Sequence, residues 1–168
     1  ISALDTAIWD AKARVLGVPL YVLLGGKARP SVPVYANGWF IGAKTPAEFA
    51  EKARRVVDQG FRAIKWDPFG SNFRSMDREA INRAIECVAE VRNAVGRNVD
   101  LMIEAHGRFD LNTGIEVGRA LEEFSISWLE EPLPPGRPFE LADLRRAVNV
   151  PIAAGERCFS RFDVMNLV

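Results

Sequence analysis

Three glutamates recur at a fixed interval in this 168-residue chain. Glu104, Glu130 and Glu156 are each separated by 26 residues, and each lies at or just after a short apolar run that is typical of a buried strand. In parallel α/β folds the carboxyl ends of neighbouring strands meet at one edge of the sheet. Three carboxylates gathered there repel one another and need a cation to stay ionised together. The spacing therefore predicts that Glu104, Glu130 and Glu156 bind a hard divalent ion such as Mg²⁺, which prefers oxygen ligands.

Two pairs of ionisable side chains lie at neighbouring strand ends. Lys65 and Asp67 are two residues apart after one apolar run, and Glu104 and His106 are two apart after the next. Side chains two apart on a strand point the same way, so each pair can be directed at one point. We favour a chemical role for His106, the single histidine, with a loop hydrogen bond as the alternative. For Lys65 a substrate contact and a structural ion pair both remain open, because a lysine on an apolar strand is costly to bury alone.

Asn37 and Arg161 are weaker candidates for substrate binding. Asn37 follows the first strand-like run of the chain, and Arg161 lies a few residues after Glu156. Asparagine is also frequent in turns and polar residues are frequent at helix starts, so a turn or cap role is the alternative for both. Cys158 is interpreted as a packing residue.

From residue 32 onward, short β-rich runs alternate with amphipathic helical segments. We predict strands at residues 32–36, 61–66, 99–105, 126–129 and 151–154. Strands that alternate with helices indicate parallel βαβ units and an α/β fold class. The strands contain few polar residues, as expected when both faces of a sheet are covered. A doubly wound open sheet and a barrel both fit this pattern.

Several helix boundaries can be predicted from capping residues. Residues 45–48, Thr-Pro-Ala-Glu, form a capping-box pattern with proline at the first helical position. Gly96 ends the helix that follows the second strand, and Asn112 is our candidate cap for the next helix. Ser160 with Asp163 predicts the start of a last helix.

Residues 1–28 do not follow the strand–helix repeat. Leu4, Ile8, Ala11 and Val15 form a helical apolar stripe, and a Gly25-Gly26 pair closes the segment. The chain opens inside this helix without a cap and closes within another helix. Because five strands cannot close a barrel that needs about eight, we expect the polypeptide to be truncated or incompletely recorded.

Charge and composition exclude several classes of partner. Lysine plus arginine and aspartate plus glutamate both number 22, so the net charge of zero argues against nucleic-acid and anionic-membrane binding. The longest mainly apolar run, residues 15–24, contains glycine and proline and is too short for a membrane span. The two cysteines form no CxxC pair, and we expect a cytoplasmic protein.

Five segments resemble the mandelate racemase/muconate lactonizing enzyme family of the enolase superfamily. The stretch "ALDTAIWDAKARVLGVPLYVLLGG" resembles the helical link that precedes the barrel in that family. The motifs "GFRAIKWDPFG", "MIEAHGRFD", "WLEEP" and "PIAAGERCFSRFD" resemble, in order, its second to fifth barrel-strand motifs. The resemblance covers nearly the whole chain and favours the barrel. It implies part of a TIM-like (β/α)7β barrel at residues 29–168, with residues 1–28 as the link from a largely absent α+β capping domain.

The resemblance also implies roles for individual residues. The three Mg²⁺ ligands of the family fall on Glu104, Glu130 and Glu156, although the first ligand is usually aspartate, and Glu131 would support them rather than bind the ion. Racemases of the family have a lysine pair on the second strand, whereas here Asp67 replaces the second lysine. Together with His106 and the "HGR" and "GERCFSRFD" segments, this replacement resembles the galactonate-type acid-sugar dehydratases.

The implied reaction is Mg²⁺-dependent removal of the proton next to a carboxylate. An enediolate forms, and loss of the β-hydroxyl then gives a 2-keto-3-deoxy acid. Lys65, His106 and Asp67 are the implied catalytic residues, an acid sugar or hydroxy-carboxylate is the implied substrate, and relatives commonly form homo-oligomers. A racemase or epimerase of the same family is the alternative, as is an inactive barrel fragment.

Overall fold

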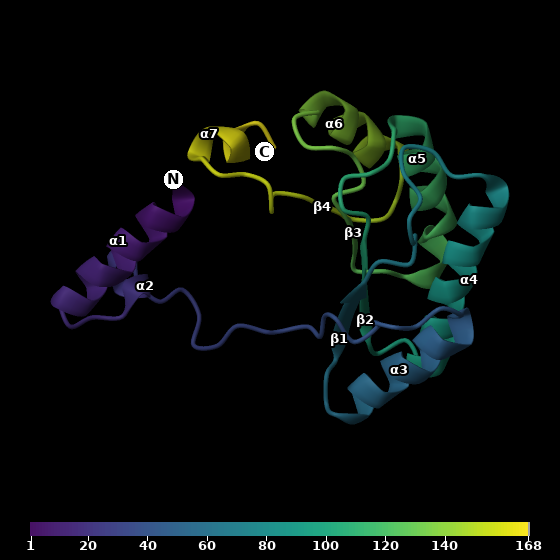
Figure 1. The fold of residues 1–168 in the computed structure, drawn as a ribbon, viewed down its shortest axis with the longest axis horizontal. Coiled ribbons are helices and arrows are strands. Elements are labelled where there is room, and N and C mark those ends of the chain that lie inside the picture. The colour runs from purple at the N-terminus through teal and green to yellow at the C-terminus, as the bar shows by residue number, and fades with distance from the viewer. Residues whose placement is uncertain (168) are drawn as a thin grey trace. The chain divides into compact units, whose positions relative to one another are not determined.

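The computed structural model describes residues 1–167 and divides into two compact units, Ile1–Val34 and Tyr35–Val168 (Figure 1). The first unit contains helices α1 (Ser2–Val15) and α2 (Leu20–Leu23). The helix predicted from the apolar stripe is therefore confirmed as a helix. Gly25 and Gly26 follow with φ of 111° and 96°, values that glycine adopts without strain and that end the helical segment. The predicted domain boundary at residue 28 stays a prediction.

A parallel sheet forms the centre of the second unit. Its strands are β1 (Ala63–Trp66), β2 (Asp100–Glu104), β3 (Trp128–Glu130) and β4 (Ile152–Ala153). Their spatial order is β1-β2-β3-β4, and each pair is parallel. A doubly wound sheet reverses its strand order at a switch point, whereas a barrel adds each strand beside the previous one. Among the described strands the order runs in one direction only, which agrees with the barrel arrangement.

Helices alternate with the strands along the chain. They are α3 (Pro46–Asp58), α4 (Arg78–Val95), α5 (Leu111–Ala120) and α6 (Pro138–Ala147), with the 3-10 turn η1 (Glu122–Phe124) after α5 and α7 (Arg161–Met165) after β4. Of these, α3 to α6 cover one side of the sheet (Figure 1). Within residues 1–167, no helix combines the length and the apolar character that crossing a bilayer requires.

The strand predicted at residues 32–36 is largely wrong. Only Ala36 pairs with the sheet, through an isolated parallel bridge to Ile64. Pro33 lies inside this predicted strand and has no backbone N–H to donate to a neighbouring strand. Val32 and Val34, on one face, are 78% and 72% exposed, and Tyr35, on the other face, is 39% exposed, so neither face is buried as the apolar pattern predicts.

Two helix starts differ in detail from the prediction. Thr45 accepts a hydrogen bond from Glu48 N, but the Glu48 carboxylate accepts from Lys44 N instead of completing the predicted box at Thr45. Asn112 is not the cap of α5: Asp110 is, and its side chain accepts from the backbone N–H of residue 113. Asparagine and aspartate cap helices equally well, so residue type alone did not distinguish the two positions. The box at Ser160 and the helix end at Gly96 are confirmed.

The two faces of the sheet differ sharply in polarity. The helix-facing residues Ile64, Trp66, Leu101, Ile103 and Leu129 are all fully buried. Because side chains alternate along a strand, the intervening positions point to the opposite face. Lys65, Glu104 and Glu130 occupy that face, so the apolar core on one side positions charged groups on the other.

Candidate active site

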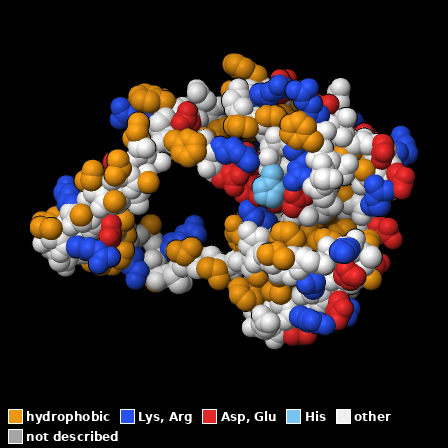
Figure 2. All heavy atoms as spheres, in the orientation of Figure 1, with side chains coloured by type: hydrophobic (Ala, Val, Ile, Leu, Met, Phe, Trp, Pro, Cys, Tyr) orange, Lys and Arg blue, Asp and Glu red, His pale blue; other side chains and the backbone are white. Residues whose placement is uncertain are grey.

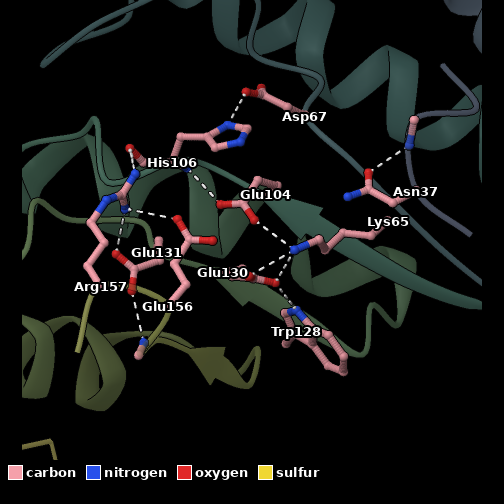
Figure 3. A network of polar contacts seen from close by, with 12 residues as sticks. Asn37, Lys65, Asp67, Glu104, His106, Trp128, Glu130, Glu131, Glu156 and Arg157 are labelled. Carbon is pink, nitrogen blue, oxygen red and sulfur yellow. Dashed lines mark hydrogen bonds and ion pairs between the residues drawn. The ribbon is translucent and has the colours of Figure 1, made fainter. Parts of the chain in front are cut away.

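The three predicted metal ligands meet at the carboxyl ends of adjacent strands (Figure 3). Glu104 ends β2 and Glu130 ends β3, and the two are direct partners in the parallel register. Glu156 follows β4 on a loop. One carboxylate oxygen from each of the three glutamates lies within 4.8 Å of the corresponding oxygens of the other two. The structure thus brings together a carboxylate cluster that can hold a cation.

Lys65 joins two members of this carboxylate cluster. Its Nζ donates to Glu104 Oε2 at 3.0 Å and to both carboxylate oxygens of Glu130 at 2.9 Å. The side chain is 8% exposed, and the structural ion pair that the sequence analysis gave as one interpretation of Lys65 is present. The ammonium also lies 5.4 Å from the ring centroid of Tyr35, a distance at which an aromatic face attracts a cation.

Burial and hydrogen bonding act in opposite directions on the pKa values of this cluster. Burial by itself lowers the pKa of Lys65, but the hydrogen bonds to Glu130 and Glu104 outweigh it, and the net pKa is raised. Burial raises the pKa of Glu104 more than its hydrogen bonds lower it. For Glu130 burial is opposed by hydrogen bonds from Lys65 and Trp128, and the net pKa is lowered. Lys65 is therefore cationic, and Glu104 takes up a proton more readily than Glu130.

Trp128 holds Glu130 from the other side. Its Nε1 donates to Glu130 Oε2 at 2.9 Å, and its ring packs edge-on against Tyr35 with centroids 6.1 Å apart. Sequence reasoning assigned neither Trp128 nor Tyr35 to the site. The available signal was strand alternation, which puts a residue two positions before Glu130 on the same face.

His106, Asp67 and Arg108 form a second network beside the cluster. His106 Nδ1 lies 2.8 Å from Asp67 Oδ2, and the same carboxylate oxygen accepts a hydrogen bond from Arg108. Arg108 also donates from Nε to the carbonyl of Ala105 at 2.8 Å. The histidine side chain is 51% exposed whereas that of Asp67 is 12% exposed. An anchored, accessible imidazole of this kind suits proton transfer to or from a bound substrate. Sequence reasoning missed Arg108.

The backbone at the strand ends has an unusual conformation. His106 lies two residues after β2, and Glu131 directly follows β3. Their φ angles of 55° and 43° fall in the left-handed region that residues other than glycine rarely adopt. The turn lets the backbone N–H of His106 donate to Glu104 Oε1 at 2.8 Å. Such strain persists where surrounding contacts determine it, and it concentrates at functional sites.

The two predicted substrate-binding residues lie outside these networks. Asn37 Oδ1 accepts from Gly38 N at 2.8 Å, which is a local turn contact. Arg161 is exposed on α7, and its guanidinium lies 4.9 Å from the ring centroid of Phe162. Among the contacts of residues 1–167, none joins either side chain to the carboxylate cluster, and their role in substrate binding stays a prediction.

The space-filling view shows how these groups reach the surface. The single histidine is visible in Figure 2 with acidic and basic side chains gathered around it. In the carboxylate cluster, Glu104 is buried, Glu130 half-buried and Glu156 exposed. The gradient from a buried to an exposed carboxylate leaves one side of the cluster open to a small ligand.

Two families match this chain in sequence. Residues 48–168 match the family described as enolase C-terminal domain-like. Residues 1–25 match the N-terminal domain family of mandelate racemase and muconate lactonizing enzyme. These matches confirm the resemblance drawn from the barrel-strand motifs.

Curated relatives and a solved structure agree with these family matches. The chain is 49% identical over 160 residues to a D-gluconate dehydratase of Thermoproteus tenax, covering 95% of this chain and 32% of the relative. It is 40% identical over 163 residues to a D-gluconate/D-galactonate dehydratase of Picrophilus torridus, covering 97% of this chain and 42% of the relative. The chain therefore spans less than half the length of these relatives.

A crystal structure of an enolase superfamily member from Salmonella Typhimurium superimposes on this chain with a TM-score of 0.90 and 33% identity. The match covers 98% of this chain and 46% of that protein. The expected fold, part of a parallel α/β barrel, is thereby confirmed.

Proposed function

Because this chain belongs to the enolase C-terminal domain-like family, we propose that the protein containing it is a Mg²⁺-dependent acid-sugar dehydratase. The reaction removes the proton next to the substrate carboxylate and expels the β-hydroxyl as water, which leaves a 2-keto-3-deoxy acid. The gluconate and galactonate dehydratases among the relatives support the substrate class. The observation that carries the proposal is the convergence of three carboxylates beside an anchored histidine.

The donor set of the carboxylate cluster fits Mg²⁺. Glu104, Glu130 and Glu156 would hold the ion, and carboxylate oxygens are the hard ligands that it prefers. When the neighbouring Glu131 is included, four carboxylates face two cations, Lys65 and Arg157. Four minus two leaves two negative charges, which a divalent cation neutralises. When bound, the ion would supply the positive charge that stabilises a second negative charge on the substrate carboxylate.

His106 is the proposed acid–base group. We assign the ring proton to Nδ1, because the Asp67 carboxylate oxygen 2.8 Å away can only accept, and Nε2 then presents its lone pair. In that tautomer the imidazole can accept the α-proton of the substrate or, once protonated, deliver a proton to the departing hydroxyl. Asp67 therefore acts by orienting His106, while Arg108 fixes Asp67 from the other side.

Lys65 is proposed to act as a fixed cation at the same point. Its ammonium already faces Glu104 and Glu130, and its raised pKa keeps it protonated at neutral pH. A substrate carboxylate or enolate oxygen placed over the cluster would accept a hydrogen bond from it. A charge-assisted hydrogen bond of this kind strengthens as negative charge develops on that oxygen.

The test uses a full-length protein that contains this sequence. The protein is incubated with Mg²⁺ and either D-gluconate or D-galactonate, and 2-keto acid formation is followed after derivatisation. We expect product with at least one of the two sugars and none after chelation of the metal. The Glu130→Gln variant, which keeps the size of the side chain and removes its charge, should form no product.

Proton exchange separates dehydration from racemisation. In D₂O, a racemase or epimerase would exchange the α-proton of the substrate and release no water. Exchange without 2-keto acid formation would therefore contradict the dehydratase proposal and favour the racemase. Neither exchange nor product with a panel of acid sugars would contradict both.

A further inference from the structure

The carboxylate of Glu131 contacts both neighbours of Glu156. Its Oε1 accepts from the backbone N–H of Gly155 at 2.9 Å, and its Oε2 accepts from Arg157 Nη1 at 2.8 Å. Glu156 lies between these two anchored residues, and Glu130 directly precedes Glu131. The short loop that presents Glu156 is therefore attached on both sides of Glu156 to the residue beside another proposed ligand.

Arg157 extends this attachment to a third strand end. Its Nη2 donates to the carbonyl of His106 at 3.3 Å, and its Nη1 lies 3.4 Å from Glu156 Oε1 (Figure 3). Gly107 leaves room for the guanidinium, because a Cβ there would lie 3.0 Å from Arg157 Nη1. One guanidinium thus connects the loops that follow β2, β3 and β4.

Burial makes this connection costly to break. Glu131 is 5% exposed, and the side chain of Arg157 is 33% exposed. Glu131 also has a φ of 43°, so its backbone is held in a conformation that its own preferences disfavour. Removing the charged partner of a buried carboxylate strongly destabilises the fold, because an unpaired charge stays buried. The pair is therefore expected to keep a single geometry.

We propose that Arg157 is a positioning residue that sets the affinity of the site for Mg²⁺. Through Glu131 it fixes the loop that carries Glu156, and through the His106 carbonyl it fixes that loop against the acid–base residue. The inference rests on the proposed function, since it assumes that Glu156 binds the ion. Groups that orient metal ligands without touching the metal commonly determine affinity in this way.

A direct substrate contact is the competing role for Arg157. A cavity of about 270 Å³ lies beside the pair and is lined in part by Glu131, Gly155 and Arg157. A substrate-binding arginine would determine KM and leave metal affinity unchanged. A positioning arginine would change metal affinity and kcat while KM for the substrate at saturating Mg²⁺ changes little.

The experiment compares three variants of the full-length protein. For Arg157→Met we expect Mg²⁺ affinity, measured by calorimetry, to fall about 10- to 100-fold together with kcat. Arg157→Lys keeps the charge opposite Glu131 and so protects folding, but its single nitrogen cannot span Glu131 and the His106 carbonyl. It should lose an intermediate amount of affinity. Arg146→Met removes an exposed arginine of a surface pair on α6 and should bind Mg²⁺ normally.

Several results would overturn the inference. Unchanged Mg²⁺ affinity in a folded Arg157→Lys protein would overturn the inference. A raised KM would then indicate a substrate contact, and a lower thermal midpoint of the metal-free protein alone would indicate a purely structural role. If the wild-type protein binds Mg²⁺ and dehydrates acid sugars while the Arg157 variants keep its Mg²⁺ affinity, this inference alone is wrong and the proposed function stands. A wild-type protein that neither binds Mg²⁺ nor turns over would remove the inference and the proposed function together.

Discussion

The charged side chains at the two ends of the parallel sheet have different partners. At the amino ends, charged groups have neutral partners nearby: Asp100 accepts from Ser127 Oγ at 3.2 Å, and Glu122 accepts two hydrogen bonds from Asn149. At the carboxyl ends, Glu131 and the three glutamates of the cluster crowd together with two cations, Lys65 and Arg157. The same four strands therefore carry a satisfied end and an end with excess negative charge.

This difference separates stability from function. A charged group whose hydrogen bonds are satisfied locally costs the fold little stability. Removing that group or its partner lowers the free energy of unfolding. Like charges held close together weaken the fold unless a ligand neutralises them, so their presence indicates a ligand. We therefore expect substitutions at the carboxyl ends to change activity and metal binding, and substitutions at the amino ends to change stability.

The largest expected effect is on activity at the carboxyl end. His106→Asn should lower kcat about 10²- to 10⁴-fold, because the proposed proton-transfer group is removed. Asparagine tolerates the φ of 55° at this position, and the backbone N–H that donates to Glu104 is retained. Steady-state kinetics of 2-keto acid formation measures the loss. Mg²⁺ affinity should stay normal, and a kcat close to that of the wild type would contradict the acid–base role.

The next effect is on stability at the amino end. Arg92 donates to the carbonyls of Gly96, Val99, Phe124 and Ser125 at 2.7–3.1 Å. Arg92→Met leaves these carbonyls without their charged donor, and we expect the free energy of unfolding to fall by about 3 kcal/mol. Urea denaturation provides the measurement, and kcat and Mg²⁺ affinity should not change.

The same helix offers a matched control for Arg92. Arg83 lies on α4 in an exposed pair with Glu79, and Arg83→Met should change the free energy of unfolding by less than about 0.5 kcal/mol. Equal losses in the two variants would show that the carbonyl contacts of Arg92 contribute nothing specific. Loss of Mg²⁺ binding in Arg92→Met would contradict the separation of the two ends.

The smallest effect concerns pH at the amino end. Hydrogen bonds from the Asn149 side chain and backbone lower the pKa of Glu122 below its ordinary value of 4.5. The ionised carboxylate therefore stabilises the fold fully above that value, and the contribution disappears as pH falls through the lowered pKa. The thermal midpoint of Glu122→Gln should lie slightly below that of the wild type at pH 7. The two midpoints should converge in acid, and a gap that persists at low pH would exclude this explanation.

The sequence was a good guide to the positions of the charged residues. Strands have a period of two and the strand–helix units repeat at nearly constant length, so equal spacing was enough to place the three glutamates at one edge. The alternation of strands with helices predicted the parallel α/β arrangement. It failed at residues 32–36, because an apolar pattern does not show whether a segment has a neighbour to pair with.

The partners of the charged side chains were harder to predict. Trp128, Arg108 and Arg157 bind site residues through contacts that depend on rotamers and on the left-handed backbone at His106 and Glu131. A single sequence carries no direct signal for either. The tertiary structure determines which of several nearby donors each carboxylate accepts from.

Calorimetric titration of the metal-free, full-length protein with Mg²⁺ tests the central claim most directly. We expect one saturable site per chain. Its affinity should fall more than about 100-fold in Glu130→Gln and in Glu156→Gln, beyond the range expected for residues that only support ligands. Saturable binding that both variants retain at wild-type strength would contradict the assignment of the three glutamates as the metal site.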